Sequence, residues 1–274
     1  LLRSENLGCK EAVSSAITWF FDHEPEGIIL EDDCLPSPAF FWFCQELLAR
    51  FRDDERIWQI CGSAVIEGRH YSQIQESYIF SRFGSIWGWA SWRRAWAYYD
   101  ANMSDWLSMR RPQLFNSVYR SYSQRRFLLD IGNKLHKGEF DTWDYQWDFT
   151  KAYQSGLCII PSNNMVVNIG FGPGATHTLK PRRWVPLLKT DRWRPITHPR
   201  YVVVNENHDL LYRRKVLLGS TSERAKRAVK NLLKGAYKFY LDNLTGMRSG
   251  FRCIHQRFNG ASGKVKSDPS PTDN

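Results

Sequence analysis

Apolar residues recur along the chain with two spacings, and these spacings predict helices that alternate with strands. Across residues 13–21, apolar side chains lie three or four positions apart, which is the period of an amphipathic helix. The short apolar runs at 28–30 and 57–61 are typical of strands buried inside a sheet. Between them, Ser37 and Pro38 predict the start of a helix, because serine caps helices and proline fits their first position.

The same alternation continues through the next hundred or so residues. Apolar runs predict further strands and mixed segments predict further helices, with strands expected at 78–80, 157–161 and 165–169 and helices at 93–99, 104–137 and 140–153. Helices and strands joined by short connections favour an α/β fold. We therefore expect a mixed, mostly parallel sheet flanked by helices.

An acidic cluster directly follows the first predicted strand. Glu31, Asp32 and Asp33 lie where that strand ends, and open α/β folds bind ligands at the carboxyl ends of their parallel strands. Crowded like charges are costly unless a cation joins them. A divalent ion held by carboxylate oxygens, with phosphates completing its shell, is such a cation. The cluster therefore predicts a metal site, and a solvated acidic turn is the alternative.

Size and charge divide the chain into parts. At 274 residues, with 42% hydrophobic and 24% charged residues, it is long enough for a large core. Residues 1–179 hold 17 Lys and Arg against 21 Asp and Glu, whereas residues 180–257 hold 19 against 5. We expect a catalytic core over 1–180, a basic Trp- and Arg-rich extension over 181–259, and a disordered tail over 260–274.

The sequence contains no apolar run that reaches the roughly 18–20 residues needed to span a bilayer, and residues 1–20 lack the pattern of a signal peptide. The six cysteines show no metal-ligand spacing and lie in apolar stretches, which favours reduced thiols and a cytoplasmic location. Residues 222–243 have the pattern of an amphipathic helix with lysines on its polar side. Such a helix could lie on an anionic membrane as a peripheral contact, or could pack its apolar face on the protein body.

The order of the motifs is more specific than any one of them. It runs from the strand with Glu31-Asp32-Asp33, through the helix at Pro38 and a strand ending in Gly62-Ser63, to Trp87-Gly88-Trp89, Trp143-Asp144 and the glycine-rich loop 170–177. Over residues 8–177 this order resembles the nucleotide-diphospho-sugar glycosyltransferases of GT-A fold. The likeness is strongest to the bacterial nucleotide-diphospho-sugar transferases, and more distant to the N-acetylglucosaminyltransferase that starts complex N-glycan formation.

The resemblance implies a reaction and a cofactor. It implies transfer of a hexosyl or N-acetylhexosaminyl group from a nucleotide-diphosphate sugar to a hydroxyl of a glycan or lipid-linked acceptor, with inversion. It also implies a Mn²⁺ or Mg²⁺ ion on the donor diphosphate, because a divalent ion stabilises the charge of a departing nucleoside diphosphate. Asp33 would bind this metal, Asp32 would face the ribose or the metal's waters, and Glu31 would face the hydroxyls of the transferred sugar.

The resemblance implies further donor contacts. Trp87, Gly88 and Trp89 would lie beside the sugar, where the glycine permits close approach. His177, after the glycine-rich loop, would reach the metal or the diphosphate when that loop closes over the donor. The alternatives are that the tryptophans only fill a core and that the histidine is structural.

Asp144 is the candidate general base. It lies between Trp143 and Trp147, where partial desolvation would raise the pKa of its carboxyl and suit it to accept a proton. In the enzymes that this chain resembles, a carboxylate near this place deprotonates the acceptor hydroxyl. Asp141 and Asp148 are alternative bases, and an ordinary acid at a helix N-terminus is the non-catalytic alternative.

One departure from the family and two rival functions complete the expectations. A GT-A domain normally begins with a strand and helix that hold the nucleotide base, and this chain begins after them, so we expect a fragment that lacks that first strand.

Paired aspartates at a strand end also suit a metal-dependent phosphohydrolase. The basic residues of 180–257 would suit a non-catalytic protein that binds polyanionic glycan or RNA, although no nucleic-acid fold motif is present and no nucleic-acid partner is expected.

Overall fold

The structure is a computed structural model that describes residues 3–64, 75–171 and 195–218. All of these residues belong to one compact unit, Leu1–Gly219. The predicted amphipathic helix, the predicted tail and most of the basic extension lie outside the described residues.

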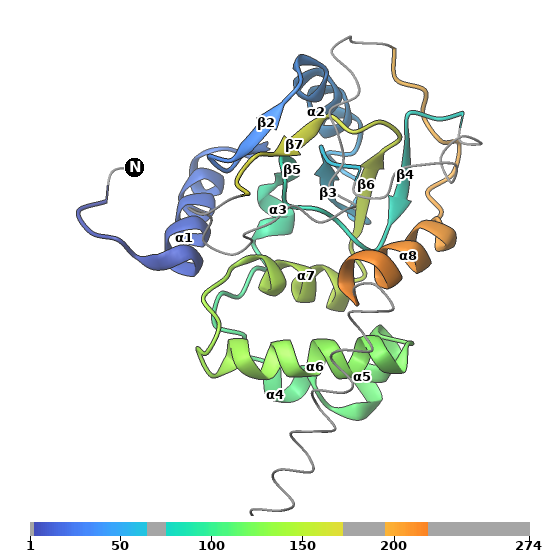
Figure 1. Cartoon of the computed structure of the whole chain (residues 1–274). Coiled ribbons are helices and arrows are strands. Elements are labelled where there is room, and N and C mark those ends of the chain that lie inside the picture. The colour runs from blue at the N-terminus through green and yellow to red at the C-terminus, as the bar shows by residue number, and fades with distance from the viewer. Residues whose placement is uncertain (1–2, 65–74, 172–194, 219–274) are drawn as a thin grey trace, which may run out of the picture. The chain divides into compact units, whose positions relative to one another are not determined.

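A five-stranded sheet organises this unit, with its strands in the order β1-β5-β3-β6-β4 (Figure 1). The strands are β1 (Glu26–Ile29), β3 (Ile57–Cys61), β4 (Tyr78–Ser81), β5 (Trp89–Trp92) and β6 (Leu157–Pro161). The β3–β6 pair is parallel, whereas β1–β5, β3–β5 and β4–β6 are antiparallel. The prediction of an α/β fold with a mixed sheet is confirmed, but the prediction that the sheet is mostly parallel is wrong.

Strand β5 accounts for most of this difference. β1 and β3 both pair antiparallel with β5, so these two strands run in the same direction, as does β6. After β4, residues 82–88 cross one face of the sheet without forming a helix, and the Ser85 carbonyl there accepts a hydrogen bond from Gln59 Nε2 at 2.8 Å. The chain then enters β5 between β1 and β3. The residues of β5 belong to the aromatic motif and were not predicted to form a strand. Local patterns also specify no strand direction, so the sequence could not show this insertion.

The first seven helices follow the predicted order with shifted ends, and the sequence patterns did not predict the eighth. They are α1 (Gly8–His23), α2 (Pro38–Arg50), α3 (Arg93–Trp96), α4 (Trp106–Met109), α5 (Pro112–Val118), α6 (Tyr122–His136), α7 (Asp144–Tyr153) and α8 (Glu206–Tyr212), and a π-helical turn, Arg213–Leu217, follows α8. The predicted helix over 13–21 and the predicted helix start at Pro38 are confirmed. The segment predicted as one helix over 104–137 holds three, and Pro112 begins the second of them, where its missing N–H is tolerated.

A second, two-stranded sheet lies next to the acidic cluster. In it β2 (Cys34–Pro36) pairs antiparallel with β7 (Val166–Asn168), which confirms the strand predicted at 165–169. The pairing brings Asp33, just before β2, against the chain just after β7. The Ile169 N–H donates to the Asp33 carbonyl at 2.8 Å. The small sheet therefore joins the acidic cluster to the start of the glycine-rich loop.

Two apolar clusters pack the helices against the main sheet. In one, α2 contributes Phe40, Phe43 and Leu47. The other is largely aromatic and joins α1, α3 and α7 through side chains that include Trp58, Trp89, Trp96, Trp143 and Trp147. Burying a large apolar side chain contributes roughly 1.5–3 kcal/mol, so these tryptophans are a main source of stability. Most of the tryptophans between residues 87 and 147 therefore fill the core.

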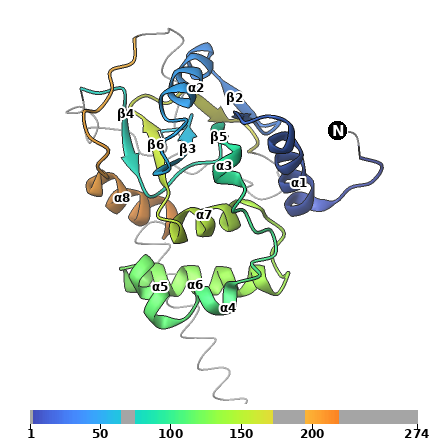
Figure 2. The same ribbon diagram turned by 180° about the vertical axis from the view of Figure 1, so that it is seen from behind.

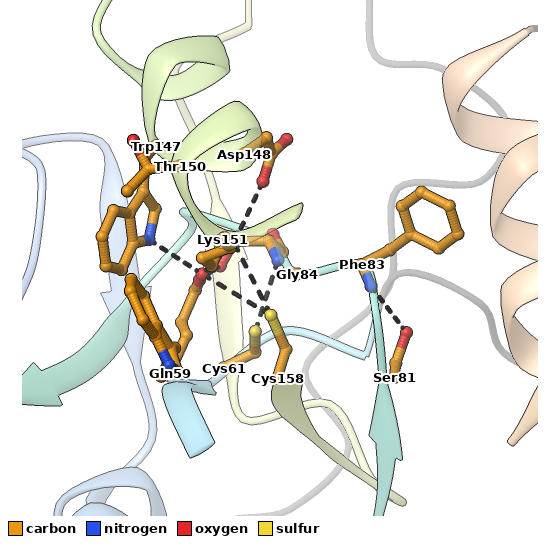
Figure 3. Close-up of polar contacts among 12 residues, drawn as sticks. Gln59, Cys61, Ser81, Phe83, Gly84, Trp147, Asp148, Thr150, Lys151 and Cys158 are labelled. Carbon is orange, nitrogen blue, oxygen red and sulfur yellow. Dashed lines mark hydrogen bonds and ion pairs between the residues drawn. The ribbon is translucent and has the colours of Figure 1, made fainter. Parts of the chain in front are cut away.

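Helix α7 is anchored to the sheet by a buried lysine (Figure 3). The Lys151 side chain is 1% exposed, and its Nζ pairs with Asp148 Oδ1 at 3.0 Å and donates to Gln59 Oε1 on β3 at 2.5 Å. Trp147 Nε1 donates to the same Gln59 oxygen at 3.1 Å. A buried ammonium is tolerated only where partners offset its desolvation. These contacts hold α7 in one place on the sheet, and Asp144 is the first residue of α7.

On its other side, α7 packs against the group formed by α4, α5 and α6, so that α7 lies between this group and the sheet (Figures 1 and 2).

The described cysteines, Cys9, Cys34, Cys44, Cys61 and Cys158, are free thiols. Among the described residues, no helix combines the length and the apolar character needed to cross a membrane.

Candidate functional site

A cavity of about 990 Å³ brings together residues that are far apart in the sequence. One wall is the apolar face of α1, and the rest comes from the end of β1, the segment before β5, the start of α7 and the segment after β7. Five of the residues predicted to form the site line this cavity: Glu31, Asp32, Asp33, Trp87 and Asp144. The fold therefore places the acidic cluster and the candidate base in one cavity.

The acidic cluster forms a tight turn between β1 and β2. The Cys34 N–H donates to the Glu31 carbonyl at 3.0 Å, which closes the turn. Asp33 lies against Gly170, where an added Cβ would come within 2.2 Å of Asp33 Oδ2. A glycine at 170 is thus required by the close approach of the Asp33 carboxylate. Gly170, the first residue of the glycine-rich loop, therefore leaves room for the Asp33 carboxylate.

The pKa of the Glu31 carboxyl is raised by its place in this turn. Burial raises its pKa to about 7, and the nearby charges of Asp33, Asp144 and Asp32 add to the rise. A hydrogen bond from Trp143 Nε1 to Glu31 Oε1, 3.0 Å long, partly offsets these effects. Without a cation in the cavity, Glu31 therefore keeps its proton to higher pH than an ordinary glutamate does.

Replacing Glu31 with glutamine should remove a pH dependence of stability. The pKa of Glu31 rises from 4.5 to about 7 on folding, so the folded state holds this proton to higher pH than the unfolded state does. The free energy of unfolding therefore falls as the pH rises between these values, by about 3 kcal/mol in metal-free protein. Urea unfolding in EDTA across this range should show the decline in the wild type and a flatter profile in Glu31→Gln. Identical profiles in the two proteins would contradict the raised pKa of Glu31.

Asp144 begins α7 and is the candidate base that lines the cavity. Burial raises the pKa of its carboxyl, although hydrogen bonds from the Thr142 hydroxyl and from backbone N–H groups partly offset the rise. A carboxyl with a raised pKa, set at the edge of a cavity, is suited to take a proton from a hydroxyl.

The two alternative bases have other partners. Asp141 accepts hydrogen bonds from the backbone N–H groups of Cys9 at 2.9 Å and Lys10 at 2.8 Å, and so caps the first turn of α1. Asp148 pairs with Lys151 in the cluster that anchors α7. Neither aspartate lines the cavity, so the geometry favours Asp144.

The aromatic motif before β5 is divided between the cavity and the core. Trp87 lines the cavity, with its ring 6.0 Å from that of Phe171. Trp89 is fully buried, stacks on Trp143 and does not line the cavity, so it belongs to the core. Gly88 has φ +64, a left-handed conformation that favours glycine, and an added Cβ would meet Val166 Cγ2 at 2.8 Å. Its close approach is therefore to Val166. His177 lies outside the described residues.

The cavity also has a wall that the sequence did not assign to a site. The apolar side chains of α1 that face it include Val13, Ala16 and Phe20. Their spacing predicts an amphipathic helix, and this pattern does not distinguish a side chain in a core from one in a cavity wall. Thr142, which binds the candidate base, is part of no recognisable sequence pattern.

The carboxylates of the cavity are consistent with a metal that takes most of its ligands from a substrate. Among the described residues, no group of three or more His, Cys, Asp or Glu side chains is placed to hold a metal ion by itself. Mg²⁺ and similar ions are often bound by one or two carboxylates, with water and substrate phosphates completing the shell. No Lys or Arg is among the described residues that line the cavity. The acidic cluster fits this kind of open site and does not form a closed protein cage.

No protein-family model matches the chain, and no curated protein matches it. The geometry and charge of the cavity are therefore the basis for a function.

Proposed function

We propose that this protein is a divalent-metal-dependent glycosyltransferase of GT-A fold. It moves a hexosyl or N-acetylhexosaminyl group from a nucleotide-diphosphate sugar to a hydroxyl of a glycan or lipid-linked acceptor. The observation that carries the proposal is a single cavity lined by the acidic cluster and by Asp144, two features separated by more than a hundred residues of sequence.

Charge is the first argument. Four carboxyl groups line the cavity, and they oppose the binding of an anionic diphosphate unless a cation is present. Since no Lys or Arg lines the described part of the cavity, a divalent metal is the simplest source of positive charge. Asp33 would hold Mn²⁺ or Mg²⁺, with Asp32 close to the metal's waters or the ribose. When bound, the ion would stabilise the negative charge of the departing nucleoside diphosphate.

The second argument is the division of tasks between the remaining side chains. Glu31 presents a carboxyl that can bind sugar hydroxyls, and Trp87 presents an aromatic surface in the same cavity. Asp144 would accept the proton of the acceptor hydroxyl as that oxygen attacks the anomeric carbon. Direct attack by the acceptor, with no enzyme nucleophile, would invert the configuration at this carbon.

The cellular setting of the proposal is cytoplasmic, with a peripheral membrane contact through residues 222–243. It rests on the cysteine usage and on the amphipathic pattern of that segment, which lies outside the described residues. A lipid-linked acceptor would be reached from such a position.

The test is a binding titration with UDP, GDP and their common sugar conjugates, with and without Mn²⁺, followed by analysis of the products of slow hydrolysis. Mn²⁺-dependent binding, with release of nucleoside diphosphate and free sugar, supports the transferase. Release of nucleoside monophosphate and sugar phosphate would show a phosphohydrolase instead. Absence of metal-dependent binding to any of these compounds would refute the proposed function.

A further inference from the structure

Trp143 contacts the acidic cluster and is next in sequence to the candidate base. Its Nε1 donates to Glu31 Oε1 at 3.0 Å, across 112 positions of sequence. It is also the residue immediately before Asp144, at the N-cap of α7. Trp143 is 1% exposed. Its buried indole therefore contacts the acidic cluster, while its backbone is bonded to that of the candidate base.

The indole of Trp143 is held from several sides. Its ring stacks on Trp89, with centroids 5.8 Å apart and an interplanar angle of 20°. The Trp143 carbonyl accepts a hydrogen bond from Tyr99 Oη at 3.1 Å. A side chain locked by packing loses little freedom when it donates a hydrogen bond, so its N–H can set the orientation of a partner carboxyl.

We propose that Trp143 is a positioning residue that orients Glu31 toward the donor sugar and fixes its place relative to Asp144. This inference rests on the proposed function. The hydrogen bond from Trp143 engages Oε1 of Glu31, which lines the cavity, and leaves Oε2 as an acceptor for a sugar hydroxyl. Trp143 acts through Glu31 and does not itself need to touch the substrate.

The neighbouring Trp89 provides a matched control. Both indoles are buried in the same aromatic cluster and stack on each other, but Trp89 Nε1 has no hydrogen-bond partner among the described residues. Trp89→Phe and Trp143→Phe remove similar volume from that cluster, and only the second removes a hydrogen bond to Glu31. A purely structural role would make the two variants behave alike.

The experiment compares the KM and kcat of both variants for the nucleotide sugar that the wild type binds with Mn²⁺. Trp143→Phe should raise the KM for the donor sugar roughly 10- to 100-fold relative to Trp89→Phe, as expected for loss of a hydrogen bond to a charged group. In a Glu31→Ala background, Trp143→Phe should have no further effect on KM, because its partner is already gone. Equal KM values in the two single variants, or additive effects in the double variant, would overturn the proposal.

A second measurement tests the contact in the wild-type fold. In a ¹⁵N spectrum of the 12 indole N–H groups, Glu31→Ala, which removes the acceptor, should shift one signal strongly, and that signal should be the one lost in Trp143→Phe. A Glu31→Ala spectrum that leaves the Trp143 signal in place would show that the hydrogen bond is absent and would overturn the proposal. If Trp143→Phe failed to fold, a Glu31→Ala spectrum in which no indole signal moves would overturn it in the same way. If the wild type binds no donor, the proposed function fails, and this positioning role fails with it, whatever the spectra show.

Discussion

Replacing Asp33 with asparagine should abolish Mn²⁺-dependent binding of the donor. Asparagine keeps the size of the side chain beside Gly170 but removes the charge that a hard cation requires. We expect the affinity for the nucleotide sugar in the presence of Mn²⁺ to fall by roughly 100-fold or more, as is common when a metal site is disturbed. Isothermal titration with and without Mn²⁺ measures this loss.

The control for this variant is Asp130→Asn. Asp130 is an acid on α6 that pairs with Lys134 at 2.7 Å and does not line the cavity. The Asp130→Asn variant should leave donor binding unchanged, because an exposed ion pair contributes little to stability and the Asp130 side chain lies away from the donor site. Metal-dependent binding that survives in Asp33→Asn would place the cation elsewhere and contradict the proposed donor site.

Replacing Asp144 with asparagine should stop transfer while leaving donor binding nearly intact. Removal of a general base typically lowers the rate by about 10²–10⁴-fold. Because burial raises the pKa of Asp144, the wild-type rate should increase with pH as this carboxyl loses its proton, and this rising limb should vanish in the variant. Single-turnover rates measured across the pH range, with donor affinity measured in parallel, test both statements.

The matched control is Asp148→Asn, one turn further along α7. Its carboxyl pairs with Lys151, and an asparagine oxygen can still accept from that ammonium, which also keeps its contact with Gln59. Transfer should therefore continue in Asp148→Asn. A loss of rate in Asp148→Asn equal to that in Asp144→Asn would assign the loss to a displaced α7 and remove Asp144 from the role of base.

The sequence was informative where local chemistry determines local structure. The end of a strand at Glu31 and the start of a helix at Pro38 follow from propensities of neighbouring residues, and both are present. The direction of β5 depends on pairing with strands far along the chain, which no local pattern encodes. For the same reason, the sequence predicted the positions of most helices and strands better than the directions in which the strands pair.

The aromatic residues show a similar limit at the site. Trp87 and Trp89 are two positions apart in one motif, yet Trp87 lines the cavity and Trp89 is fully buried. Which of them faces the cavity is decided by the turn at Gly88 and by the partners of β5. The hydrogen bond between Trp143 and Glu31 likewise joins residues 112 positions apart, and periodicity carries no information about such a contact.

The cap that Asp141 provides for α1 has a consequence for folding. The Cys9 and Lys10 amides are satisfied by a carboxylate more than 130 positions later in the chain, while Leu7 at the N-cap supplies no side-chain hydrogen bond. Closing so long a loop is entropically unfavourable, so this end of α1 gains its cap only when the segment before α7 has docked. That segment carries Thr142 and Trp143, which bind Asp144 and Glu31. The backbone amides at the start of α1 and those of residues 141–144 should therefore become protected from hydrogen exchange together, as one late cooperative unit of the fold.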